Sequence, residues 1–225
     1  MHSEPDLAAA DPLLAEPARA ELVLAALADG PLSASELAAR AGVSRSTASG
    51  HLRRLVEGRF LVVAAQGRNR RYELAGPEVA EAVEALSRVA PPRPARSLRE
   101  ANRNELIREA RTCYDHLAGV AGVDLLEAMR ARGWVRAADR GGPGFELTAR
   151  GERELARRAV DVTAARASRR RFATACLDWT ERRPHLGGAL GAGVLDALCR
   201  RSYVRRRPRG RDVQIARPLA GWLGR

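Results

Sequence analysis

The chain has 225 residues, which is enough for one large domain or for two small domains with a core each. Its hydrophobic content of 45% and charged content of 29% are those of a globular protein, so they argue against disorder. The 39 basic residues, all of them arginine, outnumber 27 acidic ones and give a net charge of +12. This excess predicts an anionic partner, since phosphate neutralisation supplies most of the sequence-independent affinity for nucleic acid.

Compartment signals in the sequence favour a cytoplasmic protein. There is no run of 18 apolar residues, and residues 1–12 are acidic, which argues against transmembrane, secretory and transit segments. The three cysteines, Cys113, Cys176 and Cys199, are an odd number at wide spacing. We therefore expect reduced thiols rather than a disulfide framework, and no membrane partner.

Two short helices are predicted near the start of the chain. Residues 17–28 begin with a proline, carry apolar side chains at helical spacing and are followed by Gly30. Ser33 and Glu36 then form a capping-box pattern, which opens a short helix that stops at Gly42.

A third helix, a hairpin and a fourth helix follow. Residues 44–58 begin with a serine N-cap and continue as a helix. The strand-like runs 60–63 and 70–74 flank a turn at 66–69 that contains glycine and asparagine. Residues 77–89 start with proline and place valines on one helical face. Helices followed by a hairpin and a helix are the order of a winged helix-turn-helix.

The segment from residue 33 to 62 resembles the helix-turn-helix of the ArsR/SmtB family of winged-helix regulators. The matching elements are the run 36–38, the turn 42–44, the polar residues 46, 47 and 49, and the pair 51–52 followed by Leu55. The resemblance covers roughly residues 13–89. It implies a transcriptional repressor that binds double-stranded DNA. A homodimer is expected because one recognition helix covers too few base pairs for useful specificity.

The spacing of side chains on these helices agrees with that resemblance. Leu37, Val43, Ala48, Leu52 and Leu55 are spaced to lock two short helices together, while polar and basic residues project from the other side. A recognition helix presents such groups near its N-terminus, where it enters the major groove. The predicted DNA contacts are Ser44, Arg45, Ser46, Thr47, Ser49, Gly50, His51, Arg53 and Arg54 of the helix and Arg68, Arg70 and Arg71 of the wing.

Plainer interpretations remain open for these residues. The helix pair can be an ordinary hairpin with a solvated polar face, and the wing can be a solvated turn. His51 suits either a structural role or a phosphate contact, and no second metal ligand lies at helical spacing from it.

Many ArsR-like proteins bind metal at positions that correspond to residues 36–40 and 77–81 of this sequence. These residues include no cysteine or histidine. Metal sensing at those positions is therefore not supported.

The second half of the chain contains an internal repeat. Three prolines in residues 90–96 predict a linker over 90–97. Beyond it, 21 residues from His116 align without gaps to 21 residues from His185, with nine identities. We expect two winged-helix-like units, 116–160 and 185–225, joined by an arginine-rich helix over 152–175. Convergent composition is the alternative explanation of the similarity.

Cysteines and histidines recur just before each copy of this repeat, as Cys113-x2-His116 and Cys176-x8-His185. Two cysteines and two histidines can be structural caps and core residues, a thiol or ligand sensor, or a tetrahedral site for zinc or another metal. Neighbouring polar residues can complete a small-molecule pocket or form a buried ion pair under an aromatic lid. The effector candidates are Cys113, Asp115, His116, Cys176, Asp178, Trp179, Arg182 and His185.

Arginine clusters at 166–172 and 200–211 suit either a solvated surface or further contact with the DNA backbone. The sequence shows no phosphate loop, nucleophile elbow or paired-acid motif, so we do not expect an enzyme. A thiol- or metal-dependent enzyme in the second half would need a perturbed cysteine near a general base.

The fold expected is therefore mainly α with small β-wings, an α+β protein. A winged helix-turn-helix domain occupies residues 1–89, and an effector domain of two repeated winged-helix-like units occupies 98–225. The function expected is a DNA-binding transcriptional regulator that reads a pseudo-palindromic operator with helix 44–57 and wing 60–74. Its C-terminal domain would sense a ligand or a thiol-reactive agent. The alternative is an architectural, nucleoid-associated DNA-binding protein without an effector.

Overall fold

The structure is a computed structural model that describes residues 11–66, 69–91, 94–95, 97–138, 144–207 and 210–224. The chain divides into two compact parts, Met1–Val83 and Glu84–Arg225, which we call unit 1 and unit 2. Both contain helices and small antiparallel sheets, so the expected α+β class is confirmed. The division falls inside helix α5 (Pro77–Val89), six residues before the end of the domain expected from the sequence.

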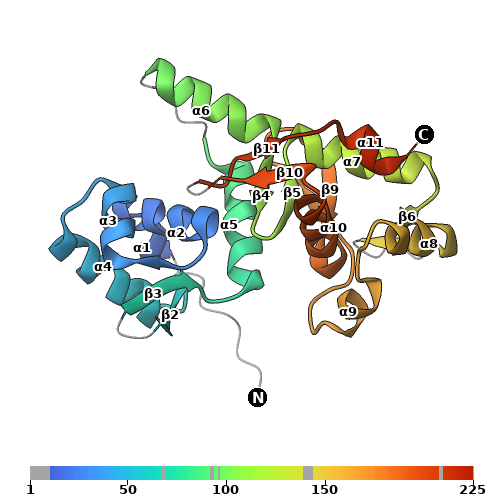
Figure 1. Ribbon diagram of the computed structural model, residues 1–225. Coiled ribbons are helices and arrows are strands. Elements are labelled where there is room, and N and C mark those ends of the chain that lie inside the picture. Colours follow the sequence, from blue (N-terminus) through green and yellow to red (C-terminus); the bar gives the residue numbers. More distant parts are fainter. Residues whose placement is uncertain are drawn as a thin grey trace. The chain divides into compact units, whose positions relative to one another are not determined.

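Unit 1 has the order of a winged helix-turn-helix (Figure 1). Its sheet has the strand order β1-β3-β2, and the long pair β2–β3 forms the wing. Strand β1 was not expected; it is only two residues long and pairs Leu32 with Tyr72. The helices are α1 (Asp11–Leu14), α2 (Pro17–Asp29), α3 (Ala34–Ala41) and α4 (Arg45–Glu57), and the strands are β1 (Leu32–Ser33), β2 (Leu61–Gln66) and β3 (Asn69–Leu74).

Local capping signals set the boundaries of α3 and α4. The Ser33 hydroxyl accepts from the Glu36 amide, and the Glu36 carboxylate accepts from the Ser33 amide at 2.8 Å, which is the predicted capping box. Gly42 ends α3 in the left-handed conformation, at φ 67°, where L side chains are disfavoured. The Ser44 hydroxyl accepts from the Thr47 amide at 3.1 Å and opens α4.

The core of unit 1 is aliphatic. Leucines at helical spacing on α2, α3 and α4 meet one another and the first residue of the wing. Val43 of the turn is only half-buried, whereas the other predicted locking residues are fully buried. The fully buried side chains are Leu22, Val23, Leu37, Ala48, Leu52, Leu55 and Leu61.

The described residues of unit 2 form four two-stranded hairpins. Segments 111–157 and 174–223 show the same order of hairpin, helix, hairpin and helix. The elements are α6 (Leu98–Glu109), β4 (Arg111–Cys113), β5 (His116–Ala118), α7 (Val120–Ala131), β6 (Val135–Ala137), β7 (Phe145–Leu147), α8 (Ala149–Arg157), α9 (Val162–Ala167), β8 (Thr174–Leu177), β9 (Pro184–Gly187), α10 (Gly188–Arg200), β10 (Val204–Arg206), β11 (Val213–Ile215) and α11 (Leu219–Leu223).

One expectation about this half was wrong, and two hairpins were not predicted. The single helix over 152–175 is two short helices, because Ala159 takes a left-handed conformation at φ 61° and Asp161 caps α9 through the Ala164 amide at 2.8 Å. The hairpins β4–β5 and β8–β9, which precede α7 and α10, were missed. Their outer strands lack the apolar alternation that marks a strand in sequence, since β4 begins with a buried arginine, Arg111.

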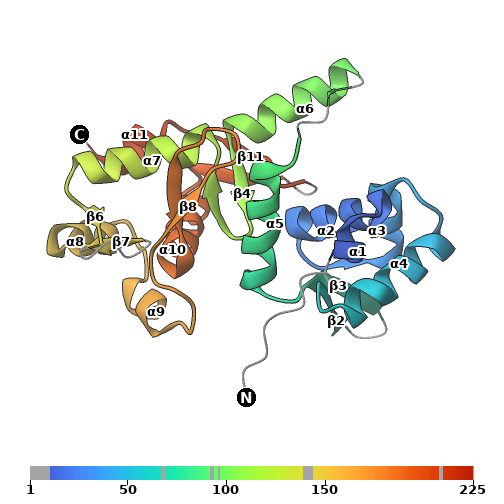
Figure 2. The ribbon, with the colours of Figure 1, turned by 180° about the vertical axis from the view of Figure 1, so that it is seen from behind.

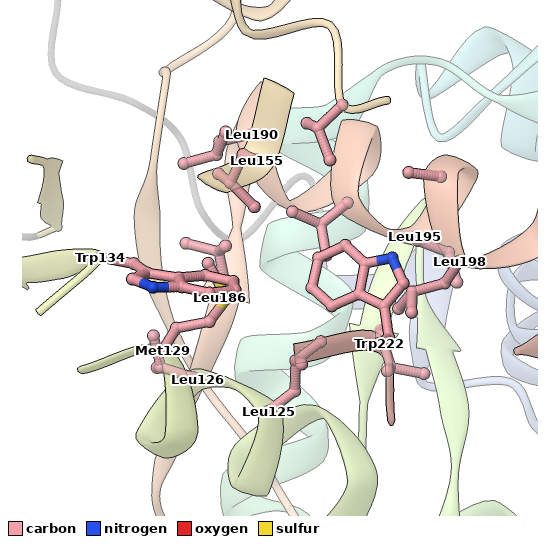
Figure 3. Packing of buried hydrophobic residues seen from close by; sticks show 14 of the residues in the cluster. Leu125, Leu126, Met129, Trp134, Leu155, Leu186, Leu190, Leu195, Leu198 and Trp222 are labelled. Atoms are coloured by element: carbon pink, nitrogen blue, oxygen red, sulfur yellow. The ribbon is translucent and has the colours of Figure 1, made fainter. Parts of the chain in front are cut away.

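One hydrophobic core joins both segments of unit 2 (Figure 3). Trp134, which follows α7, and Trp222 of α11 meet edge to face, with ring centroids 6.3 Å apart. The Arg158 guanidinium lies 4.5 Å from the Trp134 ring centroid and donates to the Trp222 carbonyl at 2.6 Å. The labelled aliphatic side chains of the figure that fill the space are Leu125, Leu126, Met129, Leu155, Leu186, Leu190, Leu195 and Leu198.

Glycines let α7 and α10 lie close to their own hairpins. Gly119 and Gly188, which the sequence alignment matched, have φ of 77° and 75°. A Cβ at Gly122 would lie 2.4 Å from the Leu117 carbonyl oxygen, and the matched Gly191 has the same relation to Leu186 at 2.3 Å. Within the described ranges, no helix is long and apolar enough to cross a membrane.

Candidate functional site

The start of α4 presents an exposed polar and basic surface. The Ser44 hydroxyl caps the helix and also hydrogen-bonds with the hydroxyls of Ser46 and Thr47, at 2.8 and 2.9 Å. The side of α4 that faces the core carries only Ala48, Leu52 and Leu55. The exposed residues of the predicted set are Ser44, Arg45, Ser46, Thr47, Ser49, Gly50, Arg53 and Arg54.

His51 differs from the other predicted contacts. Its imidazole is half-buried, with Nδ1 3.3 Å from the Arg19 guanidinium and Nε2 3.5 Å from the Glu16 carboxylate. Arg19 is itself buried and donates to the Leu13 carbonyl. Of the two roles left open for His51, these contacts favour the structural one, which fastens α4 to α2.

The arginines of the wing also divide into two kinds. Arg70 is exposed. Arg71 donates to the Pro31 carbonyl at 3.1 Å and lies 3.4 Å from the Glu36 carboxylate, so its side chain ties β3 to the start of α3. Arg68, predicted at the tip of the wing, lies outside the described residues.

Cysteine and histidine meet in unit 2 as two cross-strand pairs. Cys113 pairs with His116 across β4–β5, and Cys176 pairs with His185 across β8–β9. The four side chains, which we call the Cys/His centre, come together because β5 packs beside β9 (Figure 1, Figure 2). Each side chain contributes one possible ligand atom, a sulfur or one ring nitrogen, and these four atoms lie within 4.8 Å of one another.

Each imidazole of the centre is held by a carboxylate from its own hairpin. His116 Nδ1 lies 3.4 Å from Asp115 Oδ1, and His185 Nδ1 lies 3.2 Å from Asp178 Oδ2. Both acids stand two residues after the cysteine of their hairpin, a Cys-x-Asp pattern. Among the described residues, the buried Nε2 atoms of both histidines have no hydrogen-bond partner, and His185 Nδ1 has only its ion-pair contact with Asp178. An inward-facing nitrogen without a partner is the arrangement of a histidine prepared to bind a ligand.

The carboxylate of Asp178 makes several polar contacts beside the Cys/His centre. It pairs with Arg111 at 2.9 Å, and both side chains are fully buried. Its carboxylate also accepts from the Gly119 amide at 2.7 Å and from the Thr180 hydroxyl at 2.7 Å. Although burial opposes it, contact with His185 and Arg111 holds the pKa of Asp178 far below its usual range.

Trp179 covers this ion pair, with its ring centroid 4.8 Å from the Arg111 guanidinium. These contacts match the buried ion pair under an aromatic lid that the sequence left open, with Arg111 as the cation. Arg182 is exposed and takes a left-handed backbone conformation at φ 55° in the loop that follows β8. Asp115 pairs with Arg170. Arg111 and Arg170 were not predicted from the sequence. The repeated Cys-x-Asp pattern was the available signal, because a carboxylate beside a buried cysteine needs a cation as partner.

Charge within the centre is strongly polarised. The hydrogen bond from Cys113 and the two nearby imidazoles hold the pKa of Cys176 far below that of a free thiol. The same contact with Cys176, together with burial, raises the pKa of Cys113. Burial opposes the charged form of His116, but Asp115 and Cys176 raise its pKa to about 9. One cysteine is thus prepared as a thiolate beside an imidazolium.

An apolar groove of about 420 Å³ lies elsewhere in unit 2, between α7 and α11. Val120, Leu125, Leu219 and Leu223 line it. Asp115, Asp178, Trp179 and Arg182, which were expected around a small-molecule pocket, do not line this groove.

Comparison with known proteins decides the class of the chain. A family model described as a helix-turn-helix domain matches residues 14–64. A curated relative from Bacillus subtilis, named "Uncharacterized HTH-type transcriptional regulator YdfF", is 36% identical over 212 residues, covering 94% of this chain and 92% of the relative. The chain belongs to the helix-turn-helix-type transcriptional regulators. The expected resemblance of residues 13–89 to winged-helix regulators agrees with this membership.

Solved structures similar to this regulator match a smaller part of it. The cadmium metal-sensor CMTR from Mycobacterium tuberculosis is 33% identical and covers 41% of the regulator and 99% of its own chain, with a TM-score of 0.34. The homodimeric winged helix-turn-helix DNA-binding domain of Mb0332 from Mycobacterium bovis is 28% identical, covering 40% of the regulator and 88% of its own chain, with a TM-score of 0.32.

Proposed function

We propose that this DNA-binding regulator reads a specific operator with the N-terminal half of α4. One observation carries the proposal: Arg45, Ser46, Thr47 and Ser49 are all exposed on the first turns of a helix that Ser44 caps. Arginine can donate to two acceptors of guanine in the major groove, and short hydroxyl side chains can approach any base edge. Arg70 of the wing adds a phosphate contact beside the groove.

A homodimer on a pseudo-palindromic operator follows from the size of this reading surface. One recognition helix spans too few base pairs for useful specificity, and two-fold pairing doubles the site. Helix α5 offers an apolar surface for pairing, because Leu86 is 49% and Val89 is 79% exposed in the single chain. Burying such side chains against a second copy would stabilise a dimer.

Unit 2 is proposed as the effector domain, with the Cys/His centre as its sensing site. A buried thiol and a half-buried thiol beside two buried imidazoles with unpartnered nitrogens are unusual for a purely structural core. An effector that changes these contacts would change the packing of the hairpins that carry them. The usual outcome for such a regulator is release of a repressed operator.

The test begins by sequencing the DNA that the protein binds in cells, which gives the operator. Titrations of that operator and of random DNA at several salt concentrations follow, with Arg45→Ala and Ser46→Ala variants. We expect each variant to lose about 1–3 kcal/mol on the operator and little on random DNA. Arg130→Ala removes the same charge from an exposed position on α7 and is the matched control.

Equal losses on both kinds of DNA would contradict base reading by α4. A native protein that binds operator and random DNA alike would instead be architectural, the alternative that composition left open.

A further inference from the structure

We propose that Cys113, His116, Cys176 and His185 bind one divalent metal ion of the zinc class, with two thiolates and two imidazole Nε2 atoms as ligands. This names the effector class of the proposed sensing site, and its regulatory consequence rests on the proposed function. Binding itself does not rest on it.

The positions of the ligand atoms fit a tetrahedral ion. Two thiolates bound at about 2.3 Å to a tetrahedral zinc lie about 3.8 Å apart. The sulfur atoms of Cys113 and Cys176 are 3.8 Å apart. The rings of His116 and His185 have centroids 5.1 Å apart and are tilted by 33°, so neither stacks on the other. With all four ligand atoms within 4.8 Å, small side-chain movements complete the shell.

The surroundings of the histidines supply the outer contacts that a metal site needs. A metal-binding imidazole usually donates its other N–H to a carboxylate, which fixes the tautomer and the ring orientation. Asp115 and Asp178 stand at the Nδ1 atoms of His116 and His185. With Nδ1 facing a carboxylate, the buried Nε2 of each ring, which no described protein group satisfies, is left as the ligand atom.

The charges of the buried region also balance around a divalent cation. The carboxylates of Asp115 and Asp178 are already paired with Arg170 and Arg111. Metal binding displaces the protons that the imidazoles and thiols carry, and two thiolates then neutralise a 2+ ion beside two neutral imidazoles. Thiolate and imidazole ligands favour zinc, cobalt(II) or cadmium over magnesium and calcium, which prefer oxygen.

Small residues leave the space that the ligands require. A Cβ at Gly187 would lie 3.3 Å from His116 Nε2 and 3.3 Å from the Cys176 Cβ. A Cβ at Gly191 of α10 would lie 3.1 Å from the His116 Cβ, and one at Gly122 of α7 would lie 3.5 Å from the His185 Cβ. The helix of each segment thus makes room for the histidine of the other segment.

A metal here would cross-link two hairpins that are distant in sequence, since Cys113 and Cys176 are 63 residues apart. Binding energy at such a site becomes stability of the whole unit. A change in occupancy would therefore alter how firmly the two segments of unit 2 are held together.

The experiment uses the full chain, purified under reducing conditions, stripped with a chelator and titrated with Co(II) and Zn(II). We expect one equivalent of metal per chain, a thiolate-to-cobalt charge-transfer band, tetrahedral d–d bands, and a higher melting temperature with zinc. Cys113→Ser and Cys176→Ser should abolish the charge-transfer band or weaken it sharply. Asp115→Asn should keep the band and lower the affinity for Co(II) by about 10- to 100-fold. Cys199→Ser, a half-buried cysteine outside the centre, is the matched control.

Circular dichroism of each variant checks that it folds. If a variant does not fold, metal uptake by the native chain still tests the proposal. A folded native protein that takes up no Co(II) with thiolate bands would overturn the proposal. So would bands that disappear in Cys199→Ser but persist in Cys113→Ser. Operator binding is measured on the same samples. If the protein binds the operator but takes up no metal, the metal site is contradicted and the proposed DNA reading stands. If it takes up metal without any change in operator affinity, the metal site stands and its sensing role is contradicted.

Discussion

Helix α4 of unit 1 and helices α7 and α10 of unit 2 each follow a short turn or hairpin, but their N-termini are used in opposite ways. Helix α4 starts with an N-cap serine and exposed polar residues. Helices α7 and α10 start after glycines that make no side-chain cap; the first turn of α10 is buried, and that of α7 is partly buried. The buried carboxylate of Asp178 accepts from the Gly119 amide at the start of α7.

The difference shows what a reading helix requires. Groove contacts need an N-terminus that is capped locally, so that side chains and amides face solvent. The N-termini of α7 and α10 instead pack on hairpins that carry the Cys/His centre. This contrast agrees with the proposed functions, in which unit 2 takes an internal ligand and unit 1 an external one.

The largest expected effect comes from separating the two units. A fragment of residues 77–225 should melt cooperatively and bind the operator no better than random DNA. A fragment of 97–225 lacks Glu84, which pairs with Arg211 at 2.6 Å, and should melt at a lower temperature. Thermal denaturation and operator titration check both. Specific operator binding by residues 77–225 would contradict the contrast between the two units, because unit 2 would then read DNA.

Loss of the Asp178 carboxylate should be the most damaging single change in unit 2. Asp178→Ala leaves Arg111 buried without its partner, which typically costs about 3–5 kcal/mol. Asp196→Ala removes an acid of α10 whose side chain is 61% exposed and should change stability little. Chemical denaturation of the full chain measures both free energies. Equal stability of the two variants would show that the buried pair is unimportant.

Glycine substitutions should have opposite signs in the two units. Gly191→Ala places a Cβ 2.3 Å from the Leu186 carbonyl oxygen and should destabilise unit 2 by about 1–3 kcal/mol. Gly50→Ala on α4 meets nothing within 4 Å and should stabilise unit 1 by up to about 1 kcal/mol through helix propensity. The denaturant midpoint of each unit gives the sign of the change in its stability. If both substitutions stabilise or both destabilise, the packing argument is contradicted.

The smallest effect concerns the wing. Arg70→Ala should weaken operator and random DNA alike and lower the salt slope by about one unit, as expected for one lost phosphate contact. Arg71→Ala should leave the slope nearly unchanged and loosen the wing, since Arg71 donates to the Pro31 carbonyl. Salt titrations and hydrogen exchange in β3 separate the two variants. The reverse pattern would assign the phosphate contact to Arg71.

The sequence by itself determined the helix-turn-helix of unit 1. Its signals are local: Ser33 with Glu36, Gly42 and Ser44 act within one helical turn, and the leucine spacing follows from 3.6 residues per turn. Strand β1 was not predicted, because a strand of two residues is too short to show the alternation of apolar and polar side chains.

Only the tertiary structure decided the Cys/His centre and the orientation of individual contacts. The spacings Cys-x2-His and Cys-x8-His look unrelated, yet both become cross-strand pairs because the two hairpins have turns of different length. Assembly of the four ligands depends on packing between segments 63 residues apart, which no local pattern encodes. For the same reason, the inward turn of His51 and the anchoring of Arg71 could be seen only once the neighbouring elements were in place.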